Sequence, residues 1–125
     1  MKRVTGLGGV FFKAEDPKKL TAWYRKHLEV PEIFQWLHVD DKDAKNPSQT
    51  VWSAFKNDTT YFSPSEKPFM FNYRVENLEE LLKVLRDEGV TVVGDIQVES
   101  YGKFGWILDP EGNKVELWEP IDGEL

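Results

Sequence analysis

The residue best suited to chemistry is Glu116, which follows the turn Asp109–Asn113 and lies in the alternating segment Lys114–Trp118. Such alternation predicts a strand with one face on a core, and the pattern places the Glu116 side chain on the inward face. A carboxylate in an apolar pocket can act as a general base, or as a hydrogen-bond anchor for a cationic or hydroxylated ligand. Glu116 can equally be structural, bonded to a neighbouring side chain.

Aromatic side chains are expected around this carboxylate, because 14% of the residues are aromatic and five of them are tryptophan. Several alternate with residues of the opposite face along predicted strands, so some pack on helices and at least two should face a cavity. Those predicted to bind a ligand are Phe11, Trp52, Tyr101 and Trp106. The segment Tyr101–Gly105 has two glycines and can form a lip over the site or an ordinary loop.

Two basic residues, Lys13 and Arg74, occupy equivalent places in two similar segments. Strand alternation sets them on the same face as Gly9 and Met70, and Met70 is a further ligand-binding candidate. The two cations can flank a cavity and favour an anionic ligand such as a carboxylate, or they can pair with surface acids at the strand ends. Asn72 shares that face, and a buried amide there needs partners, so it is a candidate for specificity.

A second candidate for proton transfer is His38, which shares a strand face with Trp36 in the segment Gln35–Val39. It can reach a cavity as a proton carrier or be an ordinary strand histidine. No Ser-His-Asp order, P-loop or dinucleotide fingerprint appears in the sequence. The glycine-rich segment Gly6–Gly9 is not a phosphate-binding loop, because it precedes a strand instead of opening a helix.

The composition limits the classes of function. The chain has 125 residues, enough for one domain or two short modules, and no cysteine, so it has no disulfides, thiolate nucleophiles or zinc–thiolate sites. Its net charge of -6 leaves no basic stripe, so nucleic acid is not an expected partner. No segment approaches the ~18 apolar residues of a membrane span and no signal-cleavage pattern appears. We therefore expect a cytoplasmic protein, mature from Met1 and without membrane contact.

A repeat organises the chain, because Gly9–Asp16 matches Met70–Asn77 at an offset of 61 residues and the match continues downstream. Each half opens with alternating apolar residues, the pattern of a strand. The polar stretch 57–68 is predicted to be a linker between module 1, at about 4–56, and module 2, at about 69–120.

A helix follows the first strand of each half. Asp16 and Asn77 are predicted N-caps, and each precedes an apolar stripe with three- and four-residue spacing. Gly89 is predicted to end the second helix in the left-handed conformation. The further predicted strands are Ile33–Val39, Thr50–Phe55, Gly105–Leu108 and Lys114–Trp118, the last two joined by a turn.

Two motifs carry a family resemblance. The first is D-P-x-x-L-x-x-W-Y over Asp16–Tyr24, and the second is F-G-W-I-L-D-P-E-G-N-K-V-E-L-W-E-P over Phe104–Pro120. With the repeated order of strand, helix and three strands, they resemble the vicinal oxygen chelate superfamily, which includes glyoxalase I, bleomycin resistance proteins and extradiol dioxygenases. The resemblance implies an α+β fold of two βαβββ modules, with curled mixed sheets around an open cup-shaped cavity.

The resemblance also implies where a metal would bind. Metal-bearing members hold a divalent ion through one residue on the first and one on the last strand of each module. Carried over by position, these are Gly9, a residue near Trp52, Met70 and Glu116. One of the four is a plausible ligand, so we expect no cofactor, while a Zn, Ni or Fe site stays an alternative. A homodimer is implied as well, and an open sheet edge gives it a physical reason.

Three functions remain open. The first is a metal-independent or weakly metal-dependent enzyme, similar to the lyases, isomerases or dioxygenases of the superfamily. It would act on a small aromatic or carbonyl-bearing metabolite with Glu116 as base. The second is a binding protein in which a dimer clamps a flat small molecule between tryptophans without chemistry. The third is a metal-dependent glyoxalase-type lyase.

Overall fold

The computed structural model describes residues 3–36 and 48–121. Its elements are β1 (Val4–Ala14), α1 (Pro17–Leu28), β2 (Ile33–Trp36), β3 (Ser48–Lys56), β4 (Phe69–Val75), α2 (Leu78–Asp87), β5 (Gln97–Glu99), β6 (Gly102–Leu108) and β7 (Lys114–Pro120). Both predicted helices are present. The second half has the expected order of strand, helix and three strands, whereas the described part of the first half has two strands after α1. The sequence did not predict the short β5, nor the start of β1 at Val4. Neither helix of the described chain is long and apolar enough to cross a membrane.

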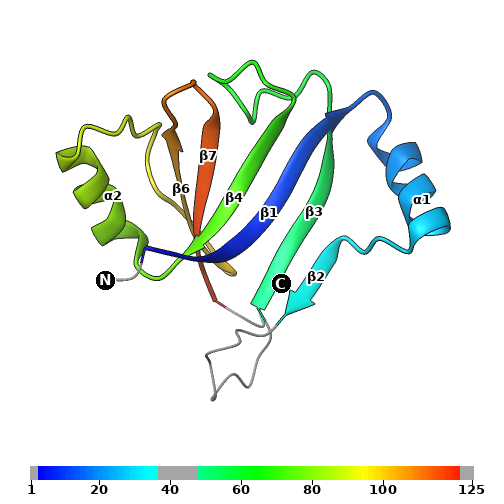
Figure 1. Ribbon diagram of the computed structural model, residues 1–125, viewed down its shortest axis with the longest axis horizontal. Helices are drawn as coiled ribbons and strands as arrows, with labels where there is room; N and C mark the ends of the chain where they lie inside the picture. The colour runs from blue at the N-terminus through cyan, green and yellow to red at the C-terminus, as the bar shows by residue number, and fades with distance from the viewer. Residues whose placement is uncertain (1–2, 37–47, 122–125) are drawn as a thin grey trace.

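The strands form one mixed, curled sheet in the order β2-β3-β1-β4-β7-β6-β5 (Figure 1). The two halves meet where β1 and β4 run antiparallel, while β1 pairs in parallel with β3, and β4 with β7. Both halves therefore contribute to one sheet within a single chain, and the predicted α+β class with a curled mixed sheet is confirmed.

The pairing of β1 with β4 reproduces the sequence repeat as a local two-fold arrangement. Gly9 lies opposite Asn72, and Phe11 lies opposite Met70. Met70 is also the repeat equivalent of Gly9, and Asn72 that of Phe11, at the offset of 61 residues. The arrangement is therefore centred on the pair Val10 and Phe71.

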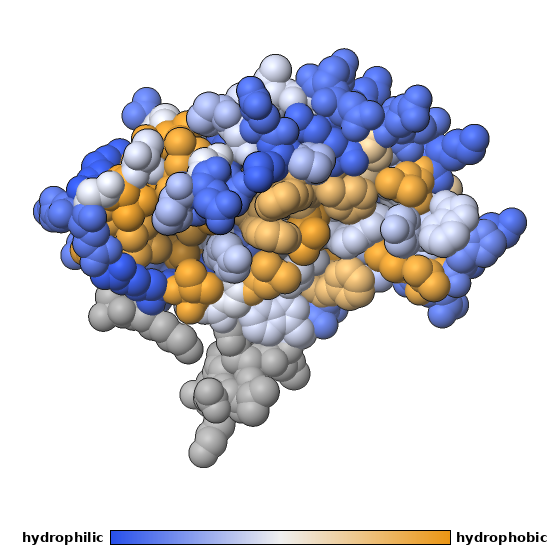
Figure 2. Space-filling model, turned by 45° about the horizontal axis from the view of Figure 1, so that its top comes forward, coloured by the Kyte–Doolittle hydropathy of each residue, from blue (hydrophilic) through white to orange (hydrophobic). Residues whose placement is uncertain are grey.

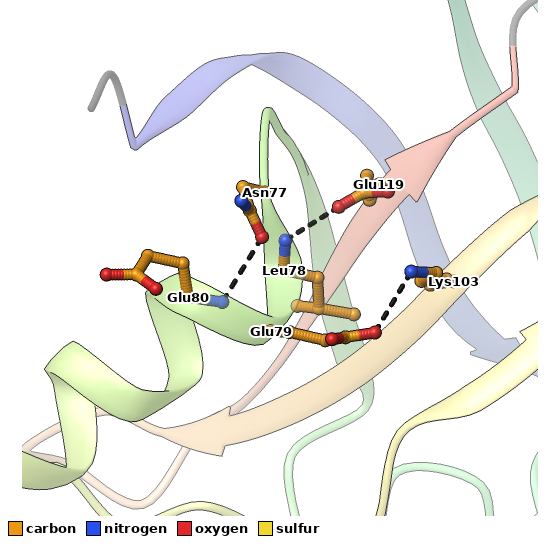
Figure 3. Close-up of polar contacts among 6 residues, drawn as sticks. All are labelled: Asn77, Leu78, Glu79, Glu80, Lys103 and Glu119. Atoms are coloured by element: carbon orange, nitrogen blue, oxygen red, sulfur yellow. Dashed lines mark hydrogen bonds and ion pairs between the residues drawn. The ribbon is translucent and has the colours of Figure 1, made fainter.

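Helix α2 begins where the sequence predicts, at an N-terminus with two side-chain acceptors (Figure 3). Asn77 Oδ1 accepts from the Glu80 amide at 3.2 Å, and Glu119 Oε1 of β7 accepts from the Leu78 amide at 2.9 Å. These acceptors satisfy two of the donors that every helix start leaves open. Gly89, which follows the C-cap Glu88, has φ +86, and this confirms the predicted left-handed end of the helix.

Helix α1 is capped by Asp16, which accepts from the Lys19 amide at 3.1 Å, and Pro17 is its first residue. The two helices differ in how many of their apolar side chains are buried. α2 buries Leu78, Leu81 and Leu82 in a core with Leu117, whereas α1 has no buried residue.

The hairpin of β6 and β7 has the predicted turn. The Asp109 carboxylate accepts from the amides of Glu111 and Asn113, both at 2.9 Å, and Gly112 has φ +80. A further bond at 2.8 Å comes from the Asn113 side chain. These bonds to Asn113 and Glu111 lower the pKa of Asp109. The turn fixes the register in which Trp106 lies opposite Glu116.

Candidate functional site

A cavity of about 280 Å³ lies on the sheet face opposite the helices. Its lining residues are Gly8, Phe11, Val51, Phe55, Tyr61, Asn72, Gln97, Glu99, Tyr101, Phe104, Glu116 and Trp118. Strand alternation separates the two faces, since Glu116 and Trp118 line the cavity while Leu117 between them packs on α2. In the part of the chain that the structure describes, the lining is rich in aromatic rings and contains two carboxylates but no lysine or arginine.

Glu116 forms the polar centre of this cavity. Only 2% of it is exposed, and its carboxylate accepts three hydrogen bonds. Asn72 Nδ2 donates to Oε1 at 2.6 Å, Trp106 Nε1 donates to Oε2 at 2.8 Å, and the Tyr61 hydroxyl also donates to Oε2. A carboxylate offers about four lone-pair sites, so about one stays open for a ligand.

The sheet register puts this cluster on one row of residues across adjacent strands. Val51 of β3 lies opposite Gly9, which lies opposite Asn72, which lies opposite Glu116, which lies opposite Trp106. Neighbouring residues on such a row are close enough for their side chains to contact. The position of Glu116 next to Asn72 and Trp106 therefore follows from strand pairing alone.

Tyr61 is the functional residue that the sequence did not predict. It comes from the 57–68 linker, stacks on Phe55 with ring centroids 5.7 Å apart, and receives a hydrogen bond at 2.7 Å from Lys114 Nζ to its carbonyl. Burial and the Glu116 charge raise the pKa of the Tyr61 hydroxyl well above its usual value, so it remains a donor. Burial lowers the pKa of Lys114, which Glu116 partly offsets. The available signal was the aromatic pair Tyr61 and Phe62 inside an otherwise polar linker.

Asn72 is held in one orientation by its neighbours. Since a carboxylate only accepts hydrogen bonds, Asn72 must present its nitrogen to Glu116, and its Oδ1 then points the other way. This Oδ1 is buried without a partner. A side chain at Gly8 would overlap it, so the backbone of β1 can pass here only as glycine.

The two predicted cations lie beside the cavity but do not line it. The Arg74 guanidinium lies between two rings, 5.8 Å from the centroid of Trp36 and 5.1 Å from that of Trp118. It also donates to the carbonyl of Gln49 at 3.1 Å. Lys13 Nζ is 5.8 Å from the ring centroid of Phe62. Both cations therefore contact aromatic rings, and neither is among the described residues that line the cavity.

The remaining predicted residues separate into three groups. Phe11 and Tyr101 line the cavity with Asn72 and Glu116. Trp106 is not among the lining residues, but its indole nitrogen donates a hydrogen bond to Glu116. Met70 is fully buried against Phe11, Phe62 and Trp106 and does not line the cavity. His38 lies outside the described residues, so its predicted role in proton transfer stays a prediction.

Trp52 needs a correction. It packs on the helix side of the sheet, with ring centroids 4.9 Å from Phe12 and 5.2 Å from Tyr24, so its predicted place in the cavity is wrong. The reason is a shift of one residue. Phe11 is the repeat equivalent of Asn72, and Ser53 lies opposite Phe11 as Glu116 lies opposite Asn72. Ser53, not Trp52, is therefore the equivalent of Glu116.

The residues at the expected metal positions do not fit a metal quartet. Gly9 has no side chain, Met70 is a soft donor, and Ser53, the positional equivalent of Glu116 next to the expected Trp52, has a neutral hydroxyl. Three N–H or O–H donors point at Glu116, where a cation would need the carboxylate lone pairs. Within residues 3–36 and 48–121, no group of three or more histidine, cysteine, aspartate or glutamate side chains could hold a metal ion. We derive no metal-dependent step.

Comparisons with known proteins agree with this architecture. The model of a family described as a glyoxalase-like domain matches residues 9–118. No curated protein matches the sequence. Among solved structures, methylmalonyl-CoA epimerase from Mycobacterium tuberculosis has a TM-score of 0.64 at 20% identity, over 97% of this chain and 91% of that chain.

Two further structures are similar. A variant of Streptomyces coelicolor methylmalonyl-CoA epimerase in complex with 2-nitronate-propionyl-CoA has a TM-score of 0.64 at 13% identity, over 94% of this chain and 98% of that chain. A glyoxalase/bleomycin resistance protein/dioxygenase superfamily member from Vibrio splendidus 12B01 has 0.56 at 11% identity, over 90% and 98%. At these identities the likeness establishes the fold alone.

Proposed function

Because the chain belongs to the glyoxalase-like domain family, within the vicinal oxygen chelate superfamily, we propose that it binds a flat small molecule in its aromatic cavity, anchored by Glu116. The observation that carries this proposal is the buried carboxylate at the polar centre of an aromatic cavity. Rings such as Phe104 and Trp118, stacked with centroids 5.7 Å apart and planes at 8°, offer flat apolar surface to a planar ligand.

The charge of the cavity supports a neutral or cationic ligand. Among residues 3–36 and 48–121, its lining holds Glu99 and Glu116 and no basic side chain. In an environment of low dielectric, a ligand carboxylate would meet Glu116 without a compensating cation, which is costly. An amino or hydroxyl group could instead donate to the open acceptor site of Glu116. The predicted preference for an anion, drawn from Lys13 and Arg74, therefore stays a prediction, since neither residue is among the described lining residues.

A ligand pair of matched shape tests this proposal. We expect 4-aminoquinoline, a planar cation, to quench tryptophan fluorescence saturably, and quinoline-4-carboxylate to bind at least about tenfold more weakly, as expected for one charge-assisted hydrogen bond. Glu116→Gln should weaken binding of the cation by about tenfold. Glu111→Gln, on the exposed β6–β7 turn, is the matched control and should bind as the parent protein does. Equal binding of both ligands, or no saturable quenching by either, would contradict the proposal.

A second candidate is a metal-independent enzyme with Glu116 as base. The observation that favours it is the pair of Glu116 and Tyr61, a carboxylate and a protonated hydroxyl placed together at the cavity. Such a pair can accept a proton at one atom and donate one at another. Mass spectrometry of ligands that bind, incubated with the protein and with Glu116→Gln, separates the candidates. Product formed only by the parent protein supports an enzyme, and unchanged ligand supports binding alone.

A further inference from the structure

The cavity is lined by two carboxylates that differ in burial. Glu116 on β7 is 2% exposed and accepts three hydrogen bonds, whereas Glu99 on β5 is an exposed residue. Both line the same cavity. None of the ion pairs among residues 3–36 and 48–121 includes either of them. The cavity therefore has one buried and one open negative charge, and the described residues supply no ion-pair partner for either.

Strand pairing places both carboxylates on one face of the sheet. Pro120 of β7 lies opposite Gly102 of β6, which lies opposite Glu99 of β5. Pro120 is four residues after Glu116, so the side chains of this row are on the same face as that of Glu116. Four residues along a strand and two strand spacings put the two Cα atoms about 16 Å apart on a flat sheet. Side-chain length and the curl of the sheet bring the two carboxylates to a separation of roughly 10 Å.

Aromatic rings occupy the row between the two carboxylates. Trp118 is two residues from Glu116 along β7 and lies opposite Phe104 of β6. These two rings are stacked with centroids 5.7 Å apart, and Tyr101 contacts Phe104 with centroids also 5.7 Å apart. All three rings line the cavity. A molecule that fills the cavity therefore contacts a carboxylate, then an aromatic wall, then a second carboxylate.

On the basis of the binding function proposed above, we propose that the ligand is a flat aromatic molecule with two donor groups, and that Glu99 selects for the second group. The first group donates to Glu116. The second is a cationic amine roughly 10 Å from the first, and it pairs with the Glu99 carboxylate at the open end of the cavity. Gln97, which also lines the cavity from β5, has an amide oxygen that can accept from the same amine. The ligand class is therefore an aromatic diamine and not a monoamine.

The charge of the cavity gives the physical reason for a second cationic group. Two carboxylates that share a cavity repel each other, and a ligand with one cation leaves one of them uncompensated. The competing explanation is that Glu99 only protects the edge strand β5, since charged residues on edge strands prevent pairing with another chain. In that case Glu99 has no effect on which ligand binds, so ligand preference separates the two explanations.

Two ligands of the same shape test the second group. N-(3-aminopropyl)quinolin-4-amine has an ammonium group where N-butylquinolin-4-amine has a methyl group, and both contain the same cationic ring system. Tryptophan-fluorescence titration gives the affinity of each compound, and the measured quantity is the ratio of the two affinities. We expect this ratio to be about two- to fivefold higher in the parent protein than in Glu99→Gln, as for one exposed ion pair. The difference should shrink at high salt, because exposed charges are screened.

A control variant must separate Glu99 from the general charge of the protein. Hydrophilic side chains cover much of the face shown in Figure 2, and the chain has 22 acidic against 16 basic residues, so any cation is attracted to it. Glu111→Gln, on the exposed β6–β7 turn, removes the same charge as Glu99→Gln and should leave the affinity ratio unchanged. Glu99→Lys should lower the ratio further, because it places a cation at the open end of the cavity.

The outcomes separate this inference from the proposed function. An affinity ratio that is equal in the parent protein, Glu99→Gln and Glu99→Lys would overturn the role of Glu99, and so would a ratio that Glu111→Gln lowers as much as Glu99→Gln does. If both compounds bind, are weakened by Glu116→Gln and give such a ratio, only the inference about the second group fails. If neither compound quenches the fluorescence saturably, the binding function itself fails, and the inference about Glu99 fails with it.

Discussion

Replacing Glu116 should reveal how strongly the cluster around it depends on an acceptor. In Glu116→Leu, the donors of Asn72 and Trp106 lose their acceptor while buried, since these residues are only 1% and 6% exposed. The Tyr61 hydroxyl sits on a part-exposed residue and can reach water. Each buried donor left without a partner costs about 1–3 kcal/mol, so the free energy of unfolding should fall by about 2–6 kcal/mol.

Glu116→Gln should cost much less, because Asn72 can adapt to it. The new side-chain oxygen can still accept from Trp106 and Tyr61, which both donate to Oε2 in the parent protein. The new side-chain nitrogen would then face Asn72 Nδ2, so the Asn72 amide should turn over and present Oδ1. That oxygen has no partner in the parent protein. The remaining loss is the charge on the acceptor, about 1–2 kcal/mol.

Urea unfolding followed by circular dichroism measures both values on the same scale. Glu111→Gln is again the control, because it changes the same residue type on the exposed turn. If Glu116→Gln is as destabilising as Glu116→Leu, the Asn72 amide is unable to turn. A cost of less than about 0.5 kcal/mol for Glu116→Leu, within the scatter of surface substitutions, would show that the buried donors do not depend on Glu116.

Three further predictions follow from single contacts. Gly8→Ala should lower the free energy of unfolding by about 1–3 kcal/mol, because the added methyl group overlaps Asn72 Oδ1; an unchanged urea midpoint would show that the strand can yield there. Asp109 has a lowered pKa in the folded chain, so its contribution to stability is present above the unfolded-state pKa of about 3.9 and is lost as the pH falls through the lower folded value. Melting temperatures of Asp109→Asn below pH ~4 should therefore depend less on pH than those of the parent protein, and parallel curves would refute the assignment. Elemental analysis of the protein as isolated should find no stoichiometric Zn, Ni or Fe, whereas one ion per chain would restore the metal-dependent lyase as a candidate.

The repeat made much of the fold predictable. Capping residues, apolar stripes and the turn Asp109–Asn113 are local signals, and the structure has both helices and the hairpin where these signals place them. The short β5 has three residues, too few for a periodic pattern, and the start of β1 is obscured by glycines whose register shifts break the alternation.

The sequence predicted the site residues whose orientation is determined by alternation along a strand. Glu116, Asn72 and Phe11 lie on the cavity face because alternation and pairing agree there. Alternation alone cannot say which of two successive residues faces inward, and for Trp52 the one-residue choice was wrong. Tyr61 could not be found by periodicity, because a linker has no repeating pattern to relate its side chains to the sheet.

The local two-fold arrangement has a consequence for how a guest molecule is oriented. A duplicated scaffold offers every group two equivalent places, yet Asn72 and Glu116 correspond to Phe11 and Ser53 in the other half. The second half supplies the polar residues Asn72 and Glu116 to the cavity, and the first half supplies the apolar Phe11. The two halves of the cavity therefore differ in polarity, so a ligand with one polar end should bind in a single preferred orientation. The orientation related to it by the local two-fold axis would place that polar end against Phe11.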